Sequence, residues 1–186
     1  MTKPAAPEGR DARGAETASN VMAALLALTV DAARSGDVTT ITHALAAGVP
    51  VESTSPRGDS LLMLAAYHGH LTAVGLLLHH GADPDQPDAR GQTPLSGVAF
   101  KGLVEVAEAL VEGGASVDLT SADGRTPLMM AAAFNRTEMV EWLLSEGASP
   151  ELRDTNGLTA LDVARAMGAT GAIDVLTGRR PEARFD

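Results

Sequence analysis

Apolar residues recur at intervals of three and four along several short stretches of the chain. That spacing places the apolar side chains on one face of a helix. Two such stretches are Leu71, Val74, Leu77, Leu78 and Met139, Val140, Leu143, Leu144. A shorter Ala-rich stretch precedes each one, as at residues 129–133. The pattern therefore predicts pairs of short helices.

Glycines repeat with a fixed step of 33 residues, in two series: Gly58, Gly91, Gly124, Gly157 and Gly48, Gly81, Gly114, Gly147. Self-similarity at this period is typical of a solenoid, in which each unit buries its apolar face only against its neighbours. We therefore expect an all-α repeat solenoid, built from stacked helix-turn-helix units that hairpin-like loops connect.

The residues around each turn agree with this prediction. Thr93 and Thr126 are suited to cap a helix, and the following Pro94 and Pro127 stand where a missing N–H costs nothing. The first helix of a unit is expected to end at Gly69, Gly102 or Asn135, since these residue types tolerate the left-handed conformation. The second helix is expected to end at the second glycine series.

The chain divides into three parts by composition. Residues 1–19 lack apolar periodicity and predict a disordered lead-in. Residues 20–176 predict about five units, the outer two degenerate and acting as caps. Residues 177–186 predict a flexible tail. Residues 21–30 have the length of a signal-peptide core, but they are in phase with the repeats, so we interpret them as the first cap helix. A cytoplasmic protein is expected, with export to the periplasm as the alternative.

Composition excludes several functions. The sequence has no cysteine, so disulfides, thiolate metal sites and cysteine nucleophiles are ruled out. The net charge of −10 argues against a nucleic-acid partner, because phosphate binding needs clustered Lys and Arg. No run of apolar residues is long enough to predict a membrane span.

Signals for catalysis or cofactors are weak. The chain has no phosphate-binding loop and no nucleophile elbow, so neither an enzyme nor a bound cofactor is expected. Asp83 and Asp85 lie in a turn, where Asp is favoured for local hydrogen bonds. The cluster His68, His70, His79, His80 leaves a metal-binding function open as an alternative, although no metal site is expected.

The motifs of the units resemble those of ankyrin-repeat proteins. They appear as Thr93-Pro94-Leu95, Thr126-Pro127-Leu128 and Gly81-Ala82-Asp83-Pro84-Asp85, and the resemblance covers about residues 20–176. The usual His of the Thr-Pro-Leu-His motif is replaced by Met63, Ser96, Met129 and Asp162. Since that His links neighbouring turns, we expect a modest loss of stability.

The resemblance implies a concave groove formed by the hairpin tips and the ends of the first helices. The residues that it places there as partner-binding are Arg57, Asp59, Tyr67, His68, Arg90, Gln92, Phe100, Lys101, Arg125, Phe134 and Arg153. Aromatic side chains make up 3% of the chain, so their gathering on one face favours an interface. The acids Glu105, Glu108, Glu112, Glu138, Glu141 and Glu146 are expected on the back.

We therefore expect a monomeric, non-catalytic adaptor whose basic and aromatic groove binds a protein segment with carboxylates and apolar anchors. An accessory factor of a dedicated enzyme is the alternative, since small bacterial ankyrin proteins include companions of peroxide-detoxifying enzymes. End-to-end stacking into oligomers is a further alternative, which the cap-like outer units oppose. The aromatic rings could instead cover neighbouring turns, and the loop arginines could pair with Asp59 or Asp123.

Overall fold

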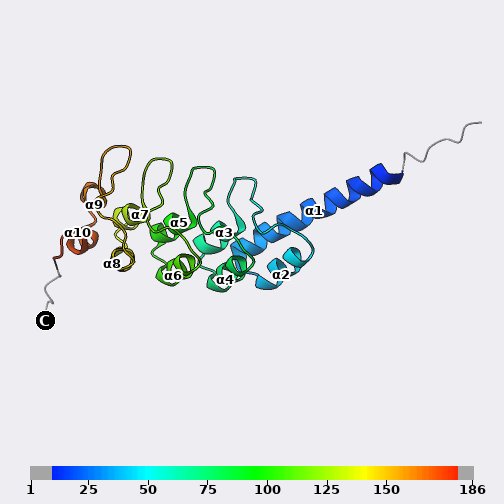
Figure 1. The fold of residues 1–186 in the computed structure, drawn as a ribbon, viewed down its shortest axis with the longest axis horizontal. Helices are drawn as coiled ribbons and strands as arrows, with labels where there is room; N and C mark the ends of the chain where they lie inside the picture. Colours follow the sequence, from blue (N-terminus) through cyan, green and yellow to red (C-terminus); the bar gives the residue numbers. More distant parts are fainter. Residues whose placement is uncertain (1–9, 180–186) are drawn as a thin grey trace, which may run out of the picture.

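A computed structural model describes residues 10–179 of the chain, and there it forms an elongated row of ten helices (Figure 1). The helices are α1 (Arg10–Ser35), α2 (Val38–Ala46), α3 (Leu61–Tyr67), α4 (Leu71–His79), α5 (Pro94–Lys101), α6 (Val104–Glu112), α7 (Pro127–Ala133), α8 (Thr137–Ser145), α9 (Ala160–Met167) and α10 (Thr170–Leu176). An isolated antiparallel bridge joins Thr54 and Ser60. The predicted all-α repeat solenoid is confirmed.

The units stack side by side in three rows (Figure 1). The first helices α3, α5, α7 and α9 form the middle row, the hairpin loops stand on one side of it, and α4, α6 and α8 lie on the other side. Helix α1 is much longer than the repeat helices and projects beyond the stack at its N-terminal end. In the part of the chain that is described, no helix combines the length and apolarity that a membrane crossing requires.

The predicted capping chemistry is present at the first helices. The hydroxyl oxygens of Thr93 and Thr126 accept hydrogen bonds from backbone N–H groups three residues on, each at 3.2 Å. Pro94 and Pro127 occupy the first turns of α5 and α7. Each cap satisfies a backbone donor that the helix itself leaves free, a contribution of about 1 kcal/mol.

One continuous apolar core runs through the stack. Equivalent leucines of successive units are buried, including Leu62, Leu95, Leu128 on the first helices and Leu77, Leu110, Leu143 on the second. Burying each leucine contributes about 1.5–3 kcal/mol. The corresponding Leu176 of α10 is only partly buried, because no further described unit packs against it.

Carboxylates hold successive hairpins together. Glu52 accepts a hydrogen bond from the Asp83 N–H at 2.7 Å, Asp85 from the Ser116 N–H at 2.9 Å, and Asp118 from the Ser149 N–H at 3.1 Å. The three acceptors keep the repeat spacing. Asp83 makes the local bond predicted for a turn, accepting from the Asp85 N–H at 2.9 Å. The bond from Asp85 to the next unit was not foreseen, since it depends on how the hairpins stack.

The structure differs from the prediction at the N-terminal end. Residues 10–19 belong to α1, whereas composition predicts a disordered lead-in there. Ala, Arg and Glu in this stretch have high helix propensity, and extending an existing helix is much easier than nucleating one. The rest of the predicted lead-in, residues 1–9, and most of the predicted tail, residues 180–186, lie outside the described residues.

The positions of the missing motif histidines are filled in different ways. Met63 and Met129 are buried in the stack. The Ser96 hydroxyl accepts a bond from the Thr93 hydroxyl at 3.2 Å, and Asp162 completes a capping box with Thr159. The Thr159 bonds also hold the pKa of Asp162 below its usual value. A modest loss of stability from the missing histidines stays a prediction.

Candidate functional site

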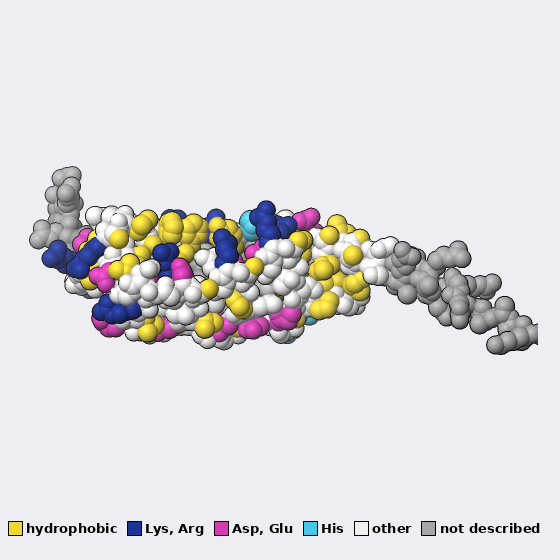
Figure 2. All heavy atoms as spheres, turned by 90° about the horizontal axis from the view of Figure 1, so that it is seen from above, with side chains coloured by type: hydrophobic (Ala, Val, Ile, Leu, Met, Phe, Trp, Pro, Cys, Tyr) yellow, Lys and Arg dark blue, Asp and Glu magenta, His cyan; other side chains and the backbone are white. Residues whose placement is uncertain are grey.

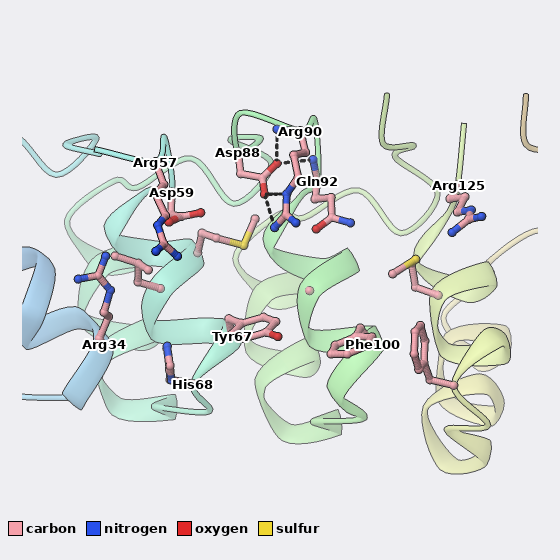
Figure 3. A pocket seen from close by; sticks show the side chains of 15 residues that line it. Arg34, Arg57, Asp59, Tyr67, His68, Asp88, Arg90, Gln92, Phe100 and Arg125 are labelled. Carbon is pink, nitrogen blue, oxygen red and sulfur yellow. Dashed lines mark hydrogen bonds and ion pairs between the residues drawn. The ribbon is translucent and has the colours of Figure 1, made fainter. Parts of the chain in front are cut away.

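An open groove of about 490 Å³ lies between the hairpin loops and the first helices (Figure 3). Most of the predicted partner-binding residues line it: Arg57, Asp59, Tyr67, His68, Arg90, Gln92, Phe100, Arg125 and Phe134. The volume is within the range of ligand-binding sites, about 300–1,000 Å³. The repeat fold therefore brings residues from three successive units to one surface.

The three aromatic residues of the groove form a continuous row. The rings of Tyr67 and Phe100 are parallel, with centroids 6.3 Å apart, and the ring of Phe134 meets Phe100 edge-on at 4.4 Å. Tyr67 is 37% exposed and Phe134 is 42% exposed, while Phe100 between them is half-buried. The rings thus support one another and still present apolar surface to solvent, an arrangement common at protein interfaces.

Two predicted residues stand outside the lining of the groove. The Lys101 ammonium lies over the Tyr67 ring, 4.6 Å from its centroid, so it fixes the aromatic row by a cation–π contact. The Arg153 guanidinium donates to the Gly157 carbonyl of its own hairpin at 2.7 Å. Arg153 therefore braces a loop, whereas Lys101 acts on the groove indirectly.

Sequence reasoning missed several residues of the groove. Arg34, Met63, Leu64, Asp88, Gly97 and Met130 also line it. Gly97 is the least expected, because a glycine inside a helix lowers stability by about 0.5–1 kcal/mol relative to Ala. The repeat spacing could have drawn attention to Gly97, because the equivalent positions in the neighbouring units are occupied by the large residues Leu64 and Met130.

The N-terminal end of the groove is basic. Arg57 stands at the tip of its hairpin and makes no ion pair within residues 19–179, and the nearby Asp59 carboxylate accepts a hydrogen bond from the Ser55 hydroxyl at 2.9 Å. Arg34 from the end of α1 faces the same space (Figure 3) and pairs with the exposed Asp31 at 2.9 Å. His68 also lines this end.

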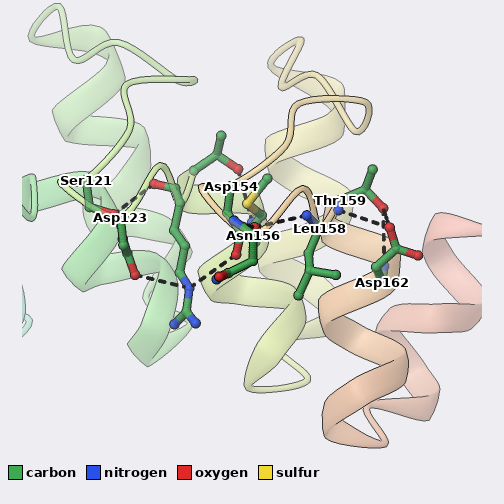
Figure 4. A network of polar contacts seen from close by, with 10 residues as sticks. Ser121, Asp123, Asp154, Asn156, Leu158, Thr159 and Asp162 are labelled. Atoms are coloured by element: carbon green, nitrogen blue, oxygen red, sulfur yellow. Dashed lines mark hydrogen bonds and ion pairs between the residues drawn. The ribbon is translucent and has the colours of Figure 1, made fainter.

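The C-terminal end is internally paired (Figure 4). Arg125 Nε lies 3.2 Å from an oxygen of Asp123 and 3.9 Å from an oxygen of Asp154 in the next hairpin. The buried Asp154 accepts the N–H groups of Asn156 and Leu158 at 2.8 and 2.9 Å. The bond from the Leu158 N–H is the main reason that the pKa of Asp154 lies below its usual value. The alternative that loop arginines pair with nearby acids therefore holds for Arg125 and Asp123.

Arg90 lies between these two ends. Its guanidinium approaches Asp88 at 3.5 Å, while Asp88 also accepts the N–H groups of Arg90 and Gln92 at 2.8 and 2.9 Å. The Arg90 side chain remains 78% exposed. Such an exposed pair is weak, about 0–1 kcal/mol, so the Arg90 guanidinium is held only loosely.

The histidines have structural surroundings. His70 Nε2 lies 2.8 Å from the Arg34 carbonyl oxygen, and its ring packs on Gly36 of the preceding unit. Burial, together with the charges of His70, Lys101 and Arg34, lowers the pKa of His68. His80 contacts the Leu76 carbonyl oxygen at 2.9 Å. Residues 19–179 contain no group of three or more potential metal ligands, and the predicted cluster is divided between the groove side and the end of α4.

Charge is distributed unevenly over the surface. Viewed toward the hairpin tips, Lys and Arg side chains lie over the middle of the molecule, and acidic side chains gather along one long edge (Figure 2). The acids predicted for the back are all exposed, on or at the end of α6 and α8: Glu105, Glu108, Glu112, Glu138, Glu141 and Glu146. The acidic side chains of α6 and α8 are thus separated from the arginines that line the groove.

The stacked helix pairs and the groove beside them define a helical repeat protein of the kind that binds on its surface. A family model described as ankyrin repeats (3 copies) matches residues 30–121 and 98–184, so the chain belongs to the ankyrin-repeat family. No curated protein matches the chain. Ankyrin repeats form interaction modules that bind other proteins and are generally non-catalytic.

Proposed function

We propose that this protein is a non-catalytic adaptor that binds a partner protein in the groove between its hairpins and first helices. The row of Tyr67, Phe100 and Phe134 would provide the apolar anchoring. Arg57 and Arg90 would hold carboxylates of the partner. Arg125 would contribute less, because Asp123 and Asp154 already neutralise it.

The observation that carries this proposal is the exposed aromatic row in a basic groove. Apolar rings that a stable core does not need are costly to leave in water unless a partner covers them. The row is held in place by ring–ring contacts and by Lys101, so binding would order few additional side chains. A preorganised surface loses less entropy on association.

The test is affinity capture from the native organism with three forms of the protein: wild type, the Phe100→Ala/Phe134→Ala variant, and a Glu108→Ala/Glu141→Ala variant of the acidic back. We expect the aromatic variant to lose the captured protein and the back variant to retain it. Thermal unfolding, followed by circular dichroism, checks that all three remain folded. Full capture by the folded aromatic variant would show that the groove assignment is wrong.

A further inference from the structure

The hairpins that precede α3, α5, α7 and α9 differ in the residue before the turn glycine. In chain order these residues are Arg57, Arg90, Asp123 and Asn156. An Asn followed by Gly is chemically labile, because glycine has no Cβ to hinder the approach of its backbone nitrogen to the Asn side chain. Asn156 and Gly157 are both exposed. The last of these hairpins therefore presents a reactive dipeptide to solvent.

This fourth hairpin is also the least covered. An added Cβ atom would lie 2.9–3.1 Å from the next hairpin at each of the three earlier turn glycines, whereas at Gly157 it would meet no described atom within 4 Å. The reason is its place in the stack, because residues 10–179 form no further hairpin beyond it (Figure 1). Local opening therefore costs less free energy here than at a hairpin packed between two neighbours.

The third hairpin carries a comparable dipeptide, Asp123-Gly124, but the fourth hairpin holds it in place. The Thr155 N–H donates to the Asp123 carbonyl at 3.0 Å, which ties the peptide unit before Gly124 to the next hairpin. The Asp123 carboxylate accepts a hydrogen bond from the Ser121 hydroxyl at 2.6 Å and pairs with Arg125 at 3.2 Å. These contacts restrain both the backbone and the side chain of Asp123.

The contacts of Asn156-Gly157 come from within their own hairpin (Figure 4). The N–H groups of Gly157 and Asn156 donate to the carbonyl and the carboxylate of Asp154, at 2.9 and 2.8 Å. Within residues 10–179, no backbone N–H donates to the Asn156 carbonyl. Opening of this one turn consequently frees the Gly157 nitrogen without breaking a contact to another hairpin.

We infer that Asn156 is a site of spontaneous modification, at which the side-chain amide becomes a carboxylate. The Gly157 nitrogen loses its proton to hydroxide and attacks Cγ of Asn156. The new N–Cγ bond closes a succinimide ring, and the side-chain nitrogen leaves as ammonia with a proton taken from water. Water then opens the ring: cleavage of the new bond gives aspartate, and cleavage of the original peptide bond gives isoaspartate. Water is the only other reactant, since hydroxide is regenerated.

The isoaspartate product loosens the hairpin that holds Arg125. Asp154 is buried and accepts the N–H groups of Asn156 and Leu158 at 2.8 and 2.9 Å. In isoaspartate the main chain runs through Cγ, so one extra carbon separates these two donors and both bonds cannot be kept. A buried carboxylate that loses a donor is destabilised. Asp154 therefore holds Arg125, now 3.9 Å away, less firmly.

The experiment compares the same dipeptide in a covered and an uncovered hairpin of one chain. The variant Asp123→Asn places Asn before Gly124 and keeps Asn156. The full chain is incubated in mildly alkaline buffer, and peptide mass spectrometry measures the conversion at each position. We expect position 156 to react at least about tenfold faster than position 123 in the folded variant, because only the latter needs two hairpins to separate. In urea the two positions are expected to react at similar rates.

Two results would overturn the site. Similar rates at positions 123 and 156 in the folded variant would mean that the neighbouring hairpin gives no protection. No conversion of Asn156 in the folded wild type, at a time when conversion is complete in urea, would mean that the turn does not open. If Asp123→Asn fails to fold, this second comparison on the wild type decides the question.

The consequence for the hairpin is measured separately. Isoaspartate-containing protein is separated by ion-exchange chromatography and identified by its methylation with a protein isoaspartyl methyltransferase. We expect its melting temperature to lie about 2–8 °C below that of the unmodified chain, the effect of one lost bond to a buried carboxylate. The control Asn156→Gln, stored in the same way, is expected to keep its melting temperature, since its longer side chain closes a ring far more slowly. An unchanged melting temperature of the isoaspartate form would show that the hairpin is not loosened.

Discussion

The two ends of the groove carry the same pair of charges in opposite order. At the N-terminal end Arg57 precedes the turn glycine and Asp59 follows it, whereas at the C-terminal end Asp123 precedes the glycine and Arg125 follows it. The position before the glycine is exposed at the hairpin tip, and the position after it is half-buried. The order therefore decides which charge a partner meets first.

The consequence appears in the contacts of the two arginines. Arg125, at the inner position, reaches both Asp123 and the buried Asp154 of the next hairpin. Arg57, at the tip, makes no ion pair within residues 19–179, and Asp59 beside it accepts a hydrogen bond from the Ser55 hydroxyl. Composition cannot distinguish these ends. An arginine inside the stack stabilises a loop, while one at a tip is available to a partner.

The largest expected effect concerns the hairpins themselves. Gly58 and Gly124 both have positive φ, at 85° and 77°. A Cβ on Gly124 would lie 3.0 Å from the Thr155 N, 3.2 Å from the Asp154 Cα and 3.3 Å from the Asp154 carbonyl carbon, while a Cβ on Gly58 would lie 3.1 Å from the Ala89 Cβ and 3.3 Å from the Ala89 N. We expect Gly124→Ala to lower the free energy of unfolding by about 2–3 kcal/mol and Gly58→Ala by about 1–2 kcal/mol.

Urea unfolding of the two glycine variants and the wild type measures this difference. All three nearest atoms at Gly124 are backbone atoms within 3.3 Å, whereas the third atom at Gly58 lies 3.6 Å away, and this closer crowding is the reason for the ranking. Equal losses in the two variants would mean that the closer packing at the C-terminal hairpins has no energetic consequence.

The next effect concerns binding. We expect Arg57→Ala to weaken the binding of an acidic peptide to the groove about tenfold, and Arg125→Ala to weaken it less than about threefold. Arg57 would lose a charge-assisted bond to the peptide, whereas Arg125 would lose its contacts within the protein. Fluorescence polarisation at low salt gives both affinities. A larger loss for Arg125→Ala would place the acid-binding site at the opposite end.

A smaller effect follows from His68, whose pKa lies below its ordinary value of 6.5 in the free protein. A bound carboxylate at the Arg34–Arg57 end would raise this pKa, so the complex takes up a proton that the free protein lacks. Affinity should then rise about two- to threefold as pH falls from about 8 to about 6. The groups facing His68 are Arg34, His70, Tyr67 and Lys101.

The matched control for this pH dependence is His68→Gln, in which the rise in affinity is expected to disappear. If the variant keeps the full pH dependence, a group other than His68 takes up the proton. The same pKa shift affects stability in the opposite direction. The free protein loses stability as pH falls below about 6.5, since the unfolded chain then binds the proton more readily.

The smallest effect comes from releasing Arg125. Asp123→Asn removes the nearer of its two carboxylate partners, at 3.2 Å, and leaves Asp154 at 3.9 Å. We expect the acidic peptide to bind about twofold more tightly, because exposed ion pairs contribute only about 0–1 kcal/mol. Isothermal titration calorimetry measures the change. Weaker binding would indicate that Asp123 holds Arg125 in a position that the peptide needs.

Much of the candidate site could be predicted because the repeats have a constant length of 33 residues, so equivalent positions can be read from the sequence. Once the glycine spacing sets the register, Tyr67, Phe100 and Phe134 must fall at the same place in successive units. The repeat spacing did not identify Gly97 as a residue of the groove. Its missing side chain becomes apparent only when Gly97 is compared with Leu64 and Met130, the residues at the same position of the neighbouring units. The repeat spacing also placed Arg153 at the groove, whereas the structure uses that side chain to brace a loop.

The sequence by itself determined the fold class, the 33-residue spacing of the repeats, the helix caps and the face on which the aromatic residues gather. These follow from local periodicity and turn chemistry, which do not depend on distant contacts. Only the tertiary structure decided which arginine is neutralised, that Asp85 bonds to the next unit, and that Tyr67 packs closely against Gly97. Each of these depends on distances between residues about 30 positions apart, and stacking alone sets those distances.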